Sequence, residues 1–368
     1  MSLKINAFVG SLFTASCLAT SVAPAMAQDE SVQDQAQTRP SDGNVGTLLQ
    51  EIVVTATKQS TAQAAQKVPI MLSAFSGEQI ENLKLTNIQN LAHTMPNVSF
   101  DTPGSTKSTA NFSIRGLGMN SSIASSAPTV GVFVNGMYMG INQGILVDTF
   151  DLEGIEVLRG PQGTLFGRNV TGGAVLLNSR KPRQEADFTA RARLETGPEY
   201  SFALAGGGGL TDTVSARLAV MYRKDEGYFK NITLDQKQGE DEVFLIKPSL
   251  RYESGGTDIT LFGEYGQNKG DGPVTHAPDY VAPGATEPYG RKYRKVYGNF
   301  PGTTDLKWHS LTLNATQDVG FGENGQIALV SGYRKFKGYS EYESDGTPLT
   351  ISHNGGYTEQ KQFSPDYS

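Results

Sequence analysis

The sequence contains a single cysteine, Cys17, among 368 residues, so no disulfide within the chain is possible. Beyond residue 27 there is no apolar run of about 20 residues, which excludes a membrane-spanning helix from that part of the chain. Basic residues are also outnumbered, with 31 Lys and Arg against 37 Asp and Glu. Because phosphate backbones are bound by basic surfaces, this balance argues against a nucleic-acid partner.

Signatures of catalysis and of cofactor binding are missing as well. The four histidines are far apart in the sequence and match no zinc-binding spacing. The glycines of "GRNVTGGA" are not followed by the Lys-Ser/Thr pair of a phosphate-binding loop, and no Ser/His/Asp arrangement stands at the turns that such catalysis needs. We therefore expect no cofactor, no bound metal and no enzymatic activity.

The first 27 residues have the layout of a secretory signal peptide: Lys4 near the start, an apolar middle, and Ala25-Met26-Ala27 as the cleavage site. Residues 28–50 are rich in Gln, Asp, Ser and Thr, a composition that predicts a disordered tail. The octet at residues 51–58, "EIVVTATK", follows this tail and contains four consecutive β-branched residues, which favour a strand. It is either a strand that pairs with another protein or the first strand of the next domain.

Residues 59–183 read as a small α+β domain. Helical spacing occurs in two short pieces that begin at Ser76 and Thr86, both good N-cap residue types. Short β-type runs surround them: "IMLSAF", "NVSF", "FSIRGLG", "VGVFVNGMYMG", "IEVLRG" and "GAVLLNS". Glycines punctuate the stretch at 151–182, "DLEGIEVLRGPQGTLFGRNVTGGAVLLNSRKP", and predict tight turns between its strands.

From Asp187 the pattern changes to strict alternation of apolar and polar residues. In "DFTARARLET" the arginines at 191 and 193 share one face, and Arg217 lies on the polar face of a later run. The connections alternate between short, as at 209–213, and long, as at 223–240, 267–306 and 338–358. Alternating short turns and long loops are typical of outer-membrane β-barrels, whereas a soluble sandwich has no reason to alternate in loop length.

These motifs together resemble the TonB-dependent outer-membrane receptors of Gram-negative bacteria. The resemblance implies an α+β plug domain at residues 59–183 and an antiparallel transmembrane β-barrel from 184 to 368, with the octet as a TonB box. It implies that TonB, with its inner-membrane energising complex, pairs with the box residues Glu51, Ile52, Val53, Val54, Thr55, Ala56 and Thr57. The first strand of the plug is the remaining alternative for the box.

The resemblance also assigns a charge cluster between plug and barrel wall to Arg115, Arg159 and Glu156, with lumen carboxylates such as Glu195 or Glu264. The alternative is that each arginine lies at the plug surface in solvent. Arg191, Arg193 and Arg217 are further lumen-side candidates, because facing lipid they would cost about 2 to 4 kcal/mol at mid-depth.

The implied function is active uptake of a scarce extracellular ligand, most often a ferric siderophore in this family, across an outer membrane whose lipid surrounds the barrel. The alternatives are a passive diffusion porin and a non-functional truncated receptor. About seven or eight strands can be placed after residue 184, whereas plugged transporters use about 22, so we expect an incomplete barrel. The identity of the ligand and its contacts are not indicated, although the tyrosines and basic residues of 267–306 would suit an anionic, aromatic ligand.

Overall fold

The computed structural model describes residues 53–54, 63–64, 71–83, 88–92, 94–101, 109, 111–118, 127–145, 149–197, 199–281, 286, 288, 294–320 and 325–367. The expected signal peptide, the tail, and the box residues Glu51, Ile52, Thr55, Ala56 and Thr57 lie outside these described residues. Residues 71–183 are called the plug below, and the large sheet at 187–367 is called the wall.

A mixed five-stranded sheet forms the centre of the plug, in the order β3-β8-β9-β6-β7. Its strands are β3 (Leu72–Ser76), β6 (Val130–Val134), β7 (Met137–Tyr138), β8 (Leu152–Arg159) and β9 (Gly173–Ser179). Strands β6 and β9 are parallel, and the other neighbours are antiparallel. The sheet contains four of the β-type runs expected from the sequence, and β4 (Val98–Asp101) and β5 (Asn111–Ile114) pair separately.

The plug helices are short: α1 (Gly77–Asn82), α2 (Ile88–Ala92) and α3 (Gly163–Phe166). Helix α1 begins where the sequence predicts, because the Ser76 hydroxyl accepts a hydrogen bond from the Gln79 backbone and the Gln79 side chain accepts one from the Ser76 backbone. Among the residues described, no helix reaches the length and apolarity that crossing a bilayer requires.

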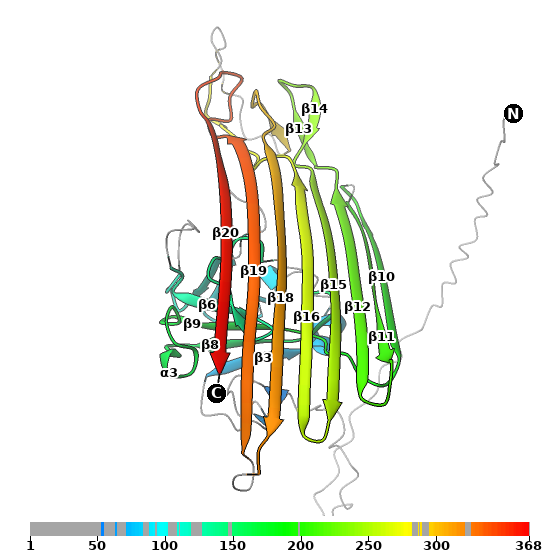
Figure 1. Cartoon of the computed structure of the whole chain (residues 1–368). Coiled ribbons are helices and arrows are strands. Elements are labelled where there is room, and N and C mark those ends of the chain that lie inside the picture. The colour runs from blue at the N-terminus through cyan, green and yellow to red at the C-terminus, as the bar shows by residue number, and fades with distance from the viewer. Residues whose placement is uncertain are drawn as a thin grey trace, which may run out of the picture. The chain divides into compact units, whose positions relative to one another are not determined.

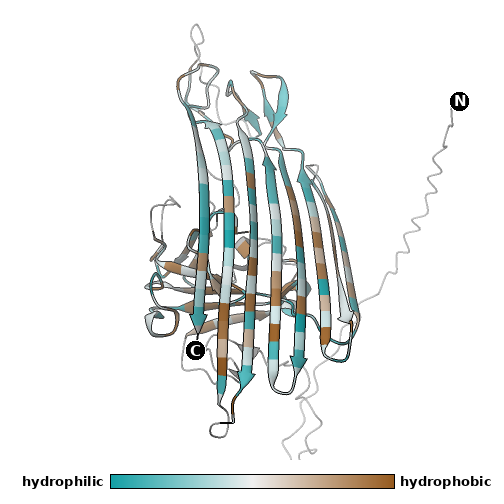
Figure 2. Cartoon of the chain, in the orientation of Figure 1, coloured by the Kyte–Doolittle hydropathy of each residue, from teal (hydrophilic) through white to brown (hydrophobic). Residues whose placement is uncertain are grey.

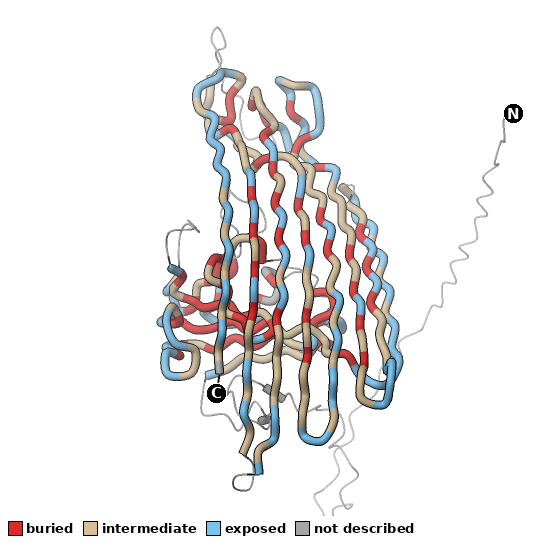
Figure 3. The backbone as a smooth tube through the Cα atoms, viewed as in Figure 1, coloured by how far each residue is buried: buried red, intermediate tan, exposed pale blue. Residues whose placement is uncertain are grey.

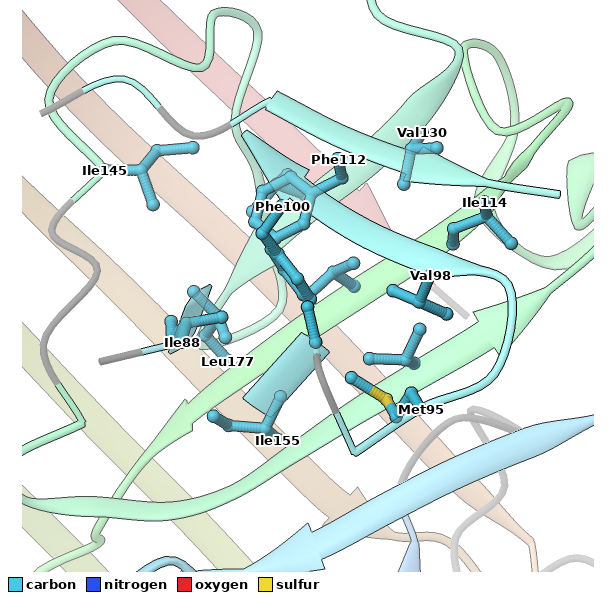
Figure 4. Close-up of a cluster of buried hydrophobic side chains, with 14 of the residues drawn as sticks. Ile88, Met95, Val98, Phe100, Phe112, Ile114, Val130, Ile145, Ile155 and Leu177 are labelled. Atoms are coloured by element: carbon cyan, nitrogen blue, oxygen red, sulfur yellow. The ribbon is translucent and has the colours of Figure 1, made fainter. Parts of the chain in front are cut away.

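Buried apolar side chains from helices α1 and α2 and several strands make the plug core (Figure 4). Phe100 and Phe112 meet edge to face across the β4–β5 hairpin, with ring centroids 4.3 Å apart. Ile155 of β8 and Leu177 of β9 join the same cluster from the central sheet. Burial of apolar surface contributes about 25 cal/mol per Å² to stability, so this cluster gives the plug a hydrophobic core of its own.

Eight antiparallel strands form the wall, in the order β10-β11-β12-β15-β16-β18-β19-β20 (Figure 1). They are β10 (Asp187–Glu195), β11 (Glu199–Gly209), β12 (Val214–Asp225), β15 (Asp241–Ser254), β16 (Thr257–Gly270), β18 (Thr303–Asp318), β19 (Gln326–Glu343) and β20 (His353–Tyr367). The number and direction of the strands confirm the expected antiparallel wall.

The two faces of the wall differ in burial, and buried and exposed residues alternate along its strands (Figure 3). On β19 the residues Arg334, Phe336 and Gly338 are buried, whereas Tyr333, Lys337 and Tyr339, which lie on the other face of the strand, are exposed. Apolar residues recur along β12 to β19, as the hydropathy colouring shows (Figure 2). The exposed face carries large apolar side chains such as Phe188, Leu218 and Leu311. This arrangement is that of a wall with one face toward lipid.

The long connections differ from the sequence-based expectation in their length. Strand β16 continues to Gly270 and β18 begins at Thr303, so the expected loop at 267–306 is shorter at both ends. The expected loop at 223–240 contains the hairpin of β13 (Phe229–Asn231) and β14 (Gln236–Gln238). Strand β17 (Lys295–Val296) pairs with β13 in parallel. The parts of β16 and β18 that lie within 267–306 are mostly polar, so the alternation of hydropathy that marks a strand in lipid is absent from them.

Candidate functional site: the seat of the plug on the wall

A buried ion pair joins the plug to the first wall strands. Arg217 of β12 donates from Nη2 to Oδ1 of Asp151 at 2.6 Å and from Nε to both carboxylate oxygens at 3.0 Å. Its Nη1 donates to Asp187 of β10 at 2.5 Å. The Arg217 and Asp151 side chains are 3% and 6% exposed. Multidentate pairing of this kind is the geometry in which arginine binds carboxylates most strongly.

Local sequence explains how these three groups meet. Asp151 has φ of 59°, a left-handed conformation that aspartate tolerates better than most residues, and it directly precedes β8. In the wall, Asp187, Gly207 and Arg217 lie opposite one another on β10, β11 and β12. Because Gly207 has no side chain, the Arg217 side chain can cross β11 and reach Asp187.

Substituting Gly207 tests this explanation. A Cβ atom at Gly207 would lie 2.5 Å from the Ala216 carbonyl oxygen and 3.0 Å from Cα of Arg217. We expect Gly207→Ala to lower the free energy of unfolding by about 1 to 3 kcal/mol, the usual cost of overpacking. Gly197→Ala is the control, because a Cβ there meets no atom within 4 Å. Equal guanidinium unfolding curves for the two variants would contradict the crowding at Gly207.

A second set of contacts links the hairpin of β6 and β7, and the segment after it, to β19 and β20. Gln362 of β20 accepts a hydrogen bond from the Gly140 backbone at 2.9 Å and donates one to the Tyr138 carbonyl. Arg334 of β19 donates from Nη2 to the Gln143 carbonyl at 2.5 Å. Within the described residues Nε and Nη1 of Arg334 have no hydrogen-bond partner, although the residue is 1% exposed. Unsatisfied buried donors cost stability, so this contact holds the plug less firmly than the Arg217 pair.

Further plug-to-wall contacts surround these two. Lys181 lies 3.4 Å from Asp258 of β16, which also accepts from Arg251. The Arg191 guanidinium lies 5.3 Å from the centre of the Phe150 ring. Arg191 and Arg217 therefore face the plug, as the alternation in the sequence predicts. Arg193 pairs instead with Glu195 of its own strand at 3.2 Å.

A small cavity lies between the plug and the middle of the wall. Its lining includes Asn135, Asp151 and Arg180 from the plug and Lys247 and Glu264 from the wall. The volume of this cavity is about 20 Å³, which is room for one or a few water molecules. Polar groups thus line the boundary between plug and wall here.

The residues expected to form a charge cluster with the wall make contacts inside the plug. Arg159 donates to the Ser73 hydroxyl at 2.7 Å and to the Pro96 carbonyl at 3.3 Å. Arg115 contacts the sulfur of Met71. Glu156 is buried in the central sheet and accepts from Asn178 at 3.4 Å. Their role in a cluster with the wall remains a prediction.

Glu264, expected as a lumen carboxylate, accepts from the Trp308 indole at 2.6 Å and lies 4.0 Å from Lys247. Neither Asp151 nor Asp187 could be recognised from the sequence as a partner of Arg217. Only their positions could have marked these two aspartates, because Asp151 is the first residue of the glycine-rich stretch and Asp187 is the first residue of the first wall strand. Across the described residues, no group of three His, Cys, Asp or Glu side chains is arranged to hold a metal ion.

Two residues of the expected TonB box are described as a strand. Strand β1 (Val53–Val54) pairs antiparallel with β2 (Gln63–Ala64), with Val53 opposite Ala64 and Val54 opposite Gln63. A two-residue pairing offers few hydrogen bonds, each with a net contribution of about 0.5 to 1.5 kcal/mol. The pairing is therefore weak enough to be exchanged for another strand.

The long connections bind one another at the end of the wall where they emerge. Asn231 of the β13–β14 hairpin donates to the Gly298 carbonyl at 2.9 Å, and Gln238 donates to the Pro301 carbonyl at 3.3 Å. In the connection between β19 and β20, burial alone would raise the pKa of Asp345, but hydrogen bonds from Thr347 and Ser352 outweigh it and hold the pKa at about 2. These connections are thus ordered by their own contacts.

Comparison with known proteins identifies the plug. The family model described as "TonB-dependent Receptor Plug Domain" matches residues 64–174. The ferrichrome outer membrane transporter/phage receptor of Escherichia coli K12 is 25% identical over 235 residues, which cover 62% of this chain and 29% of that protein. The vitamin B12 transporter BtuB of Vibrio vulnificus is 26% identical over 180 residues, or 49% of this chain and 28% of that one.

Solved structures show the same fold. The pyoverdine outer membrane receptor FpvA of Pseudomonas aeruginosa superposes with a TM-score of 0.67 at 16% identity, over 86% of this chain and 45% of that one. The siderophore receptor PiuA of Acinetobacter baumannii gives a TM-score of 0.65 at 20% identity, over 82% of this chain and 42% of that one. The chain thus spans less than half the length of these receptors.

The eight-stranded wall corresponds to part of the barrel of these receptors, and the plug is seated against it through Arg217 and Asp151. The family consists of outer-membrane receptors and transporters rather than enzymes. Residues 64–174 are thus a TonB-dependent receptor plug domain, and the chain is similar in sequence and in fold to outer-membrane receptors of Gram-negative bacteria.

Proposed function

We propose that this chain supplies the plug and adjoining wall of a receptor that takes up a ferric siderophore across the outer membrane with energy from TonB. The main observation in favour of the proposal is that the buried pair of Arg217 and Asp151 holds the plug against the wall. A seated plug has to be moved before a ligand can pass, so transport needs an external source of energy. Strand β1 lies ahead of the plug in the chain, where a pull on it would be transmitted to the plug.

The names of the relatives favour a ferric siderophore over any other transported ligand. Their names include receptors for ferrichrome, for ferrioxamine B and for catecholate siderophores. A vitamin B12 transporter is among them too, so cobalamin is the second candidate. The passive porin is disfavoured, because a pore open to diffusion has no use for a domain bound to its inner face.

Uptake by cells tests the proposal. The receptor that contains this chain would be expressed in a Gram-negative host that lacks its own siderophore receptors, with and without TonB, and offered radioactive iron as ferrichrome, ferrioxamine B or a ferric catecholate. We expect one ferric complex to accumulate, and only in cells with TonB. Labelled vitamin B12 is the comparison ligand.

Two results would contradict the proposal. Equal accumulation with and without TonB would indicate a passive pore. Accumulation of vitamin B12 alone would keep the receptor but replace its cargo.

A further inference from the structure

An uninterrupted apolar row crosses the inner face of the wall. It contains one residue from each of six neighbouring strands, β11, β12, β15, β16, β18 and β19, and all six are buried. In the order of the strands they are Ala203, Met221, Leu245, Gly266, Trp308 and Phe336, each opposite the next. This row is called the apolar belt below. The inner face of an outer-membrane barrel is usually polar, so the belt needs an explanation.

Polar and charged residues lie in the rows on both sides of the apolar belt. Toward the long connections, the next row contains Arg223 and Asn268. Toward the short turns, the next row contains Lys247 and Glu264, which also line the small cavity between plug and wall. The belt therefore separates two polar levels of the inner face, and the cavity lies on its short-turn side.

The apolar belt is closely packed and offers almost nothing to water. Because Gly266 has no side chain, the indole ring of Trp308 lies against its backbone, and a Cβ atom at this glycine would overlap the ring. The indole N–H is the only side-chain donor of the belt, and it donates to Glu264 in the polar row below at 2.6 Å. A water molecule in the belt would find only the weakly accepting sulfur of Met221.

The plug covers the apolar belt with apolar residues of its own. Ile141 and Phe150 are buried in one hydrophobic cluster with the belt side chains. At the β19 end of the belt, a Cβ atom at Gly144 would lie 2.7 Å from the ring of Phe336. At the β11 end, the ring of Phe150 faces the guanidinium of Arg191, the β10 neighbour of the belt. Plug residues therefore lie against the belt from one end to the other.

We propose that the apolar belt and the plug residues on it are the permeability seal of the receptor, which excludes water and hydrated ions while the plug is in place. Ion pairs and hydrogen bonds hold the plug, but water can enter between polar groups because it hydrates them. Hydrated solutes do not cross an apolar constriction, because water leaves it. Arg217 and Asp151 thus hold the plug, and the belt seals it. The proposal depends neither on the transported ligand nor on TonB.

Ion conductance tests the proposal. The receptor that contains this chain would be reconstituted in a planar lipid bilayer between potassium chloride solutions, and the steady current measured. Met221→Gln should raise the current about tenfold, because a polar side chain of similar shape lowers the cost of water in the belt by about that of one buried polar group. Met221→Leu should be as tight as the wild type, because it keeps the belt apolar at nearly the same volume.

Met95→Gln is the matched control. Met95 and Met221 are 5% and 3% exposed, but Met95 lies in the plug core rather than against the wall. The same substitution there should leave the current unchanged. Protease resistance of the plug is the second readout, and it should stay at the wild-type level in Met221→Gln, because the pair of Arg217 and Asp151 is intact.

Three outcomes would overturn the proposal. They are a wild-type current in Met221→Gln, an equal rise in Met95→Gln, and a current that rises only together with protease sensitivity of the plug, which would make the leak a consequence of a loosened plug. If Met221→Gln does not assemble in the outer membrane, Ala203→Ser at the neighbouring belt position should still raise the current, though by less. A wild-type current in that variant would then contradict the seal.

Discussion

Arg217→Ala should loosen the plug from the wall more than any other single substitution among the plug-to-wall contacts. The change leaves the Asp151 carboxylate buried without its cation, and removal of one partner of a buried pair costs about 3 to 5 kcal/mol. We expect a lower free energy of unfolding in guanidinium and faster proteolysis of the plug. Cells that carry the variant should also become more sensitive to large antibiotics.

Arg223→Ala is the matched control. Arg223 lies on the same strand and pairs with Asp241 of β15 at 2.6 Å, so its partner belongs to the wall. The side chains of Arg223 and Asp241 are 30% and 19% exposed, so solvent screens this pair more than the Arg217 pair and its loss should cost less. Asp151→Asn should behave like Arg217→Ala, because asparagine tolerates the left-handed backbone but carries no charge. If both arginine variants lose the same stability, Arg217 does not anchor the plug.

Val54→Pro should abolish uptake while surface abundance and ligand binding stay normal. Proline removes a backbone N–H and disfavours the pairing geometry of the residue before it, so strand addition by TonB would fail. The measurement is accumulation of the iron complex that the wild type transports, beside binding of the same complex to energy-depleted cells.

Ala64→Pro separates the two pairings of β1. Ala64 lies opposite Val53 in β2, so proline there disrupts the pairing within the chain but leaves residues 51–58 unchanged. Uptake should persist in Ala64→Pro if the box pairs with TonB. Unchanged uptake by Val54→Pro would remove the TonB-box assignment, and loss in both variants would make β1 a structural strand of this chain.

Much of the fold follows from local sequence. The Ser76 capping box, the glycine-punctuated strands of the plug and the two-residue alternation of the wall are all set by neighbours a few positions apart. Alternation also placed Arg191 and Arg217 on the inner face, because an arginine facing lipid is costly.

The partners of these arginines could not be predicted in the same way. Asp151 is 66 residues from Arg217 in sequence, and their meeting depends on a left-handed turn and on the missing side chain of Gly207. The same holds for Arg159. The resemblance assigned it to a charge cluster with the wall, which remains a prediction, but its hydrogen bond to Ser73 of β3 within the plug sheet could not be predicted from the sequence.

The central claim, that this chain is pulled by TonB, is tested most directly by cross-linking. Val54→Cys would be introduced into the full chain, expressed with TonB that carries single cysteines along its edge strand, and oxidised in intact cells. Disulfide-linked product should form, should increase when the transported iron complex is added, and should be lost when Pro is also placed at position 53. Absence of cross-linked product at every TonB position, with the variant present at the cell surface, would contradict the account.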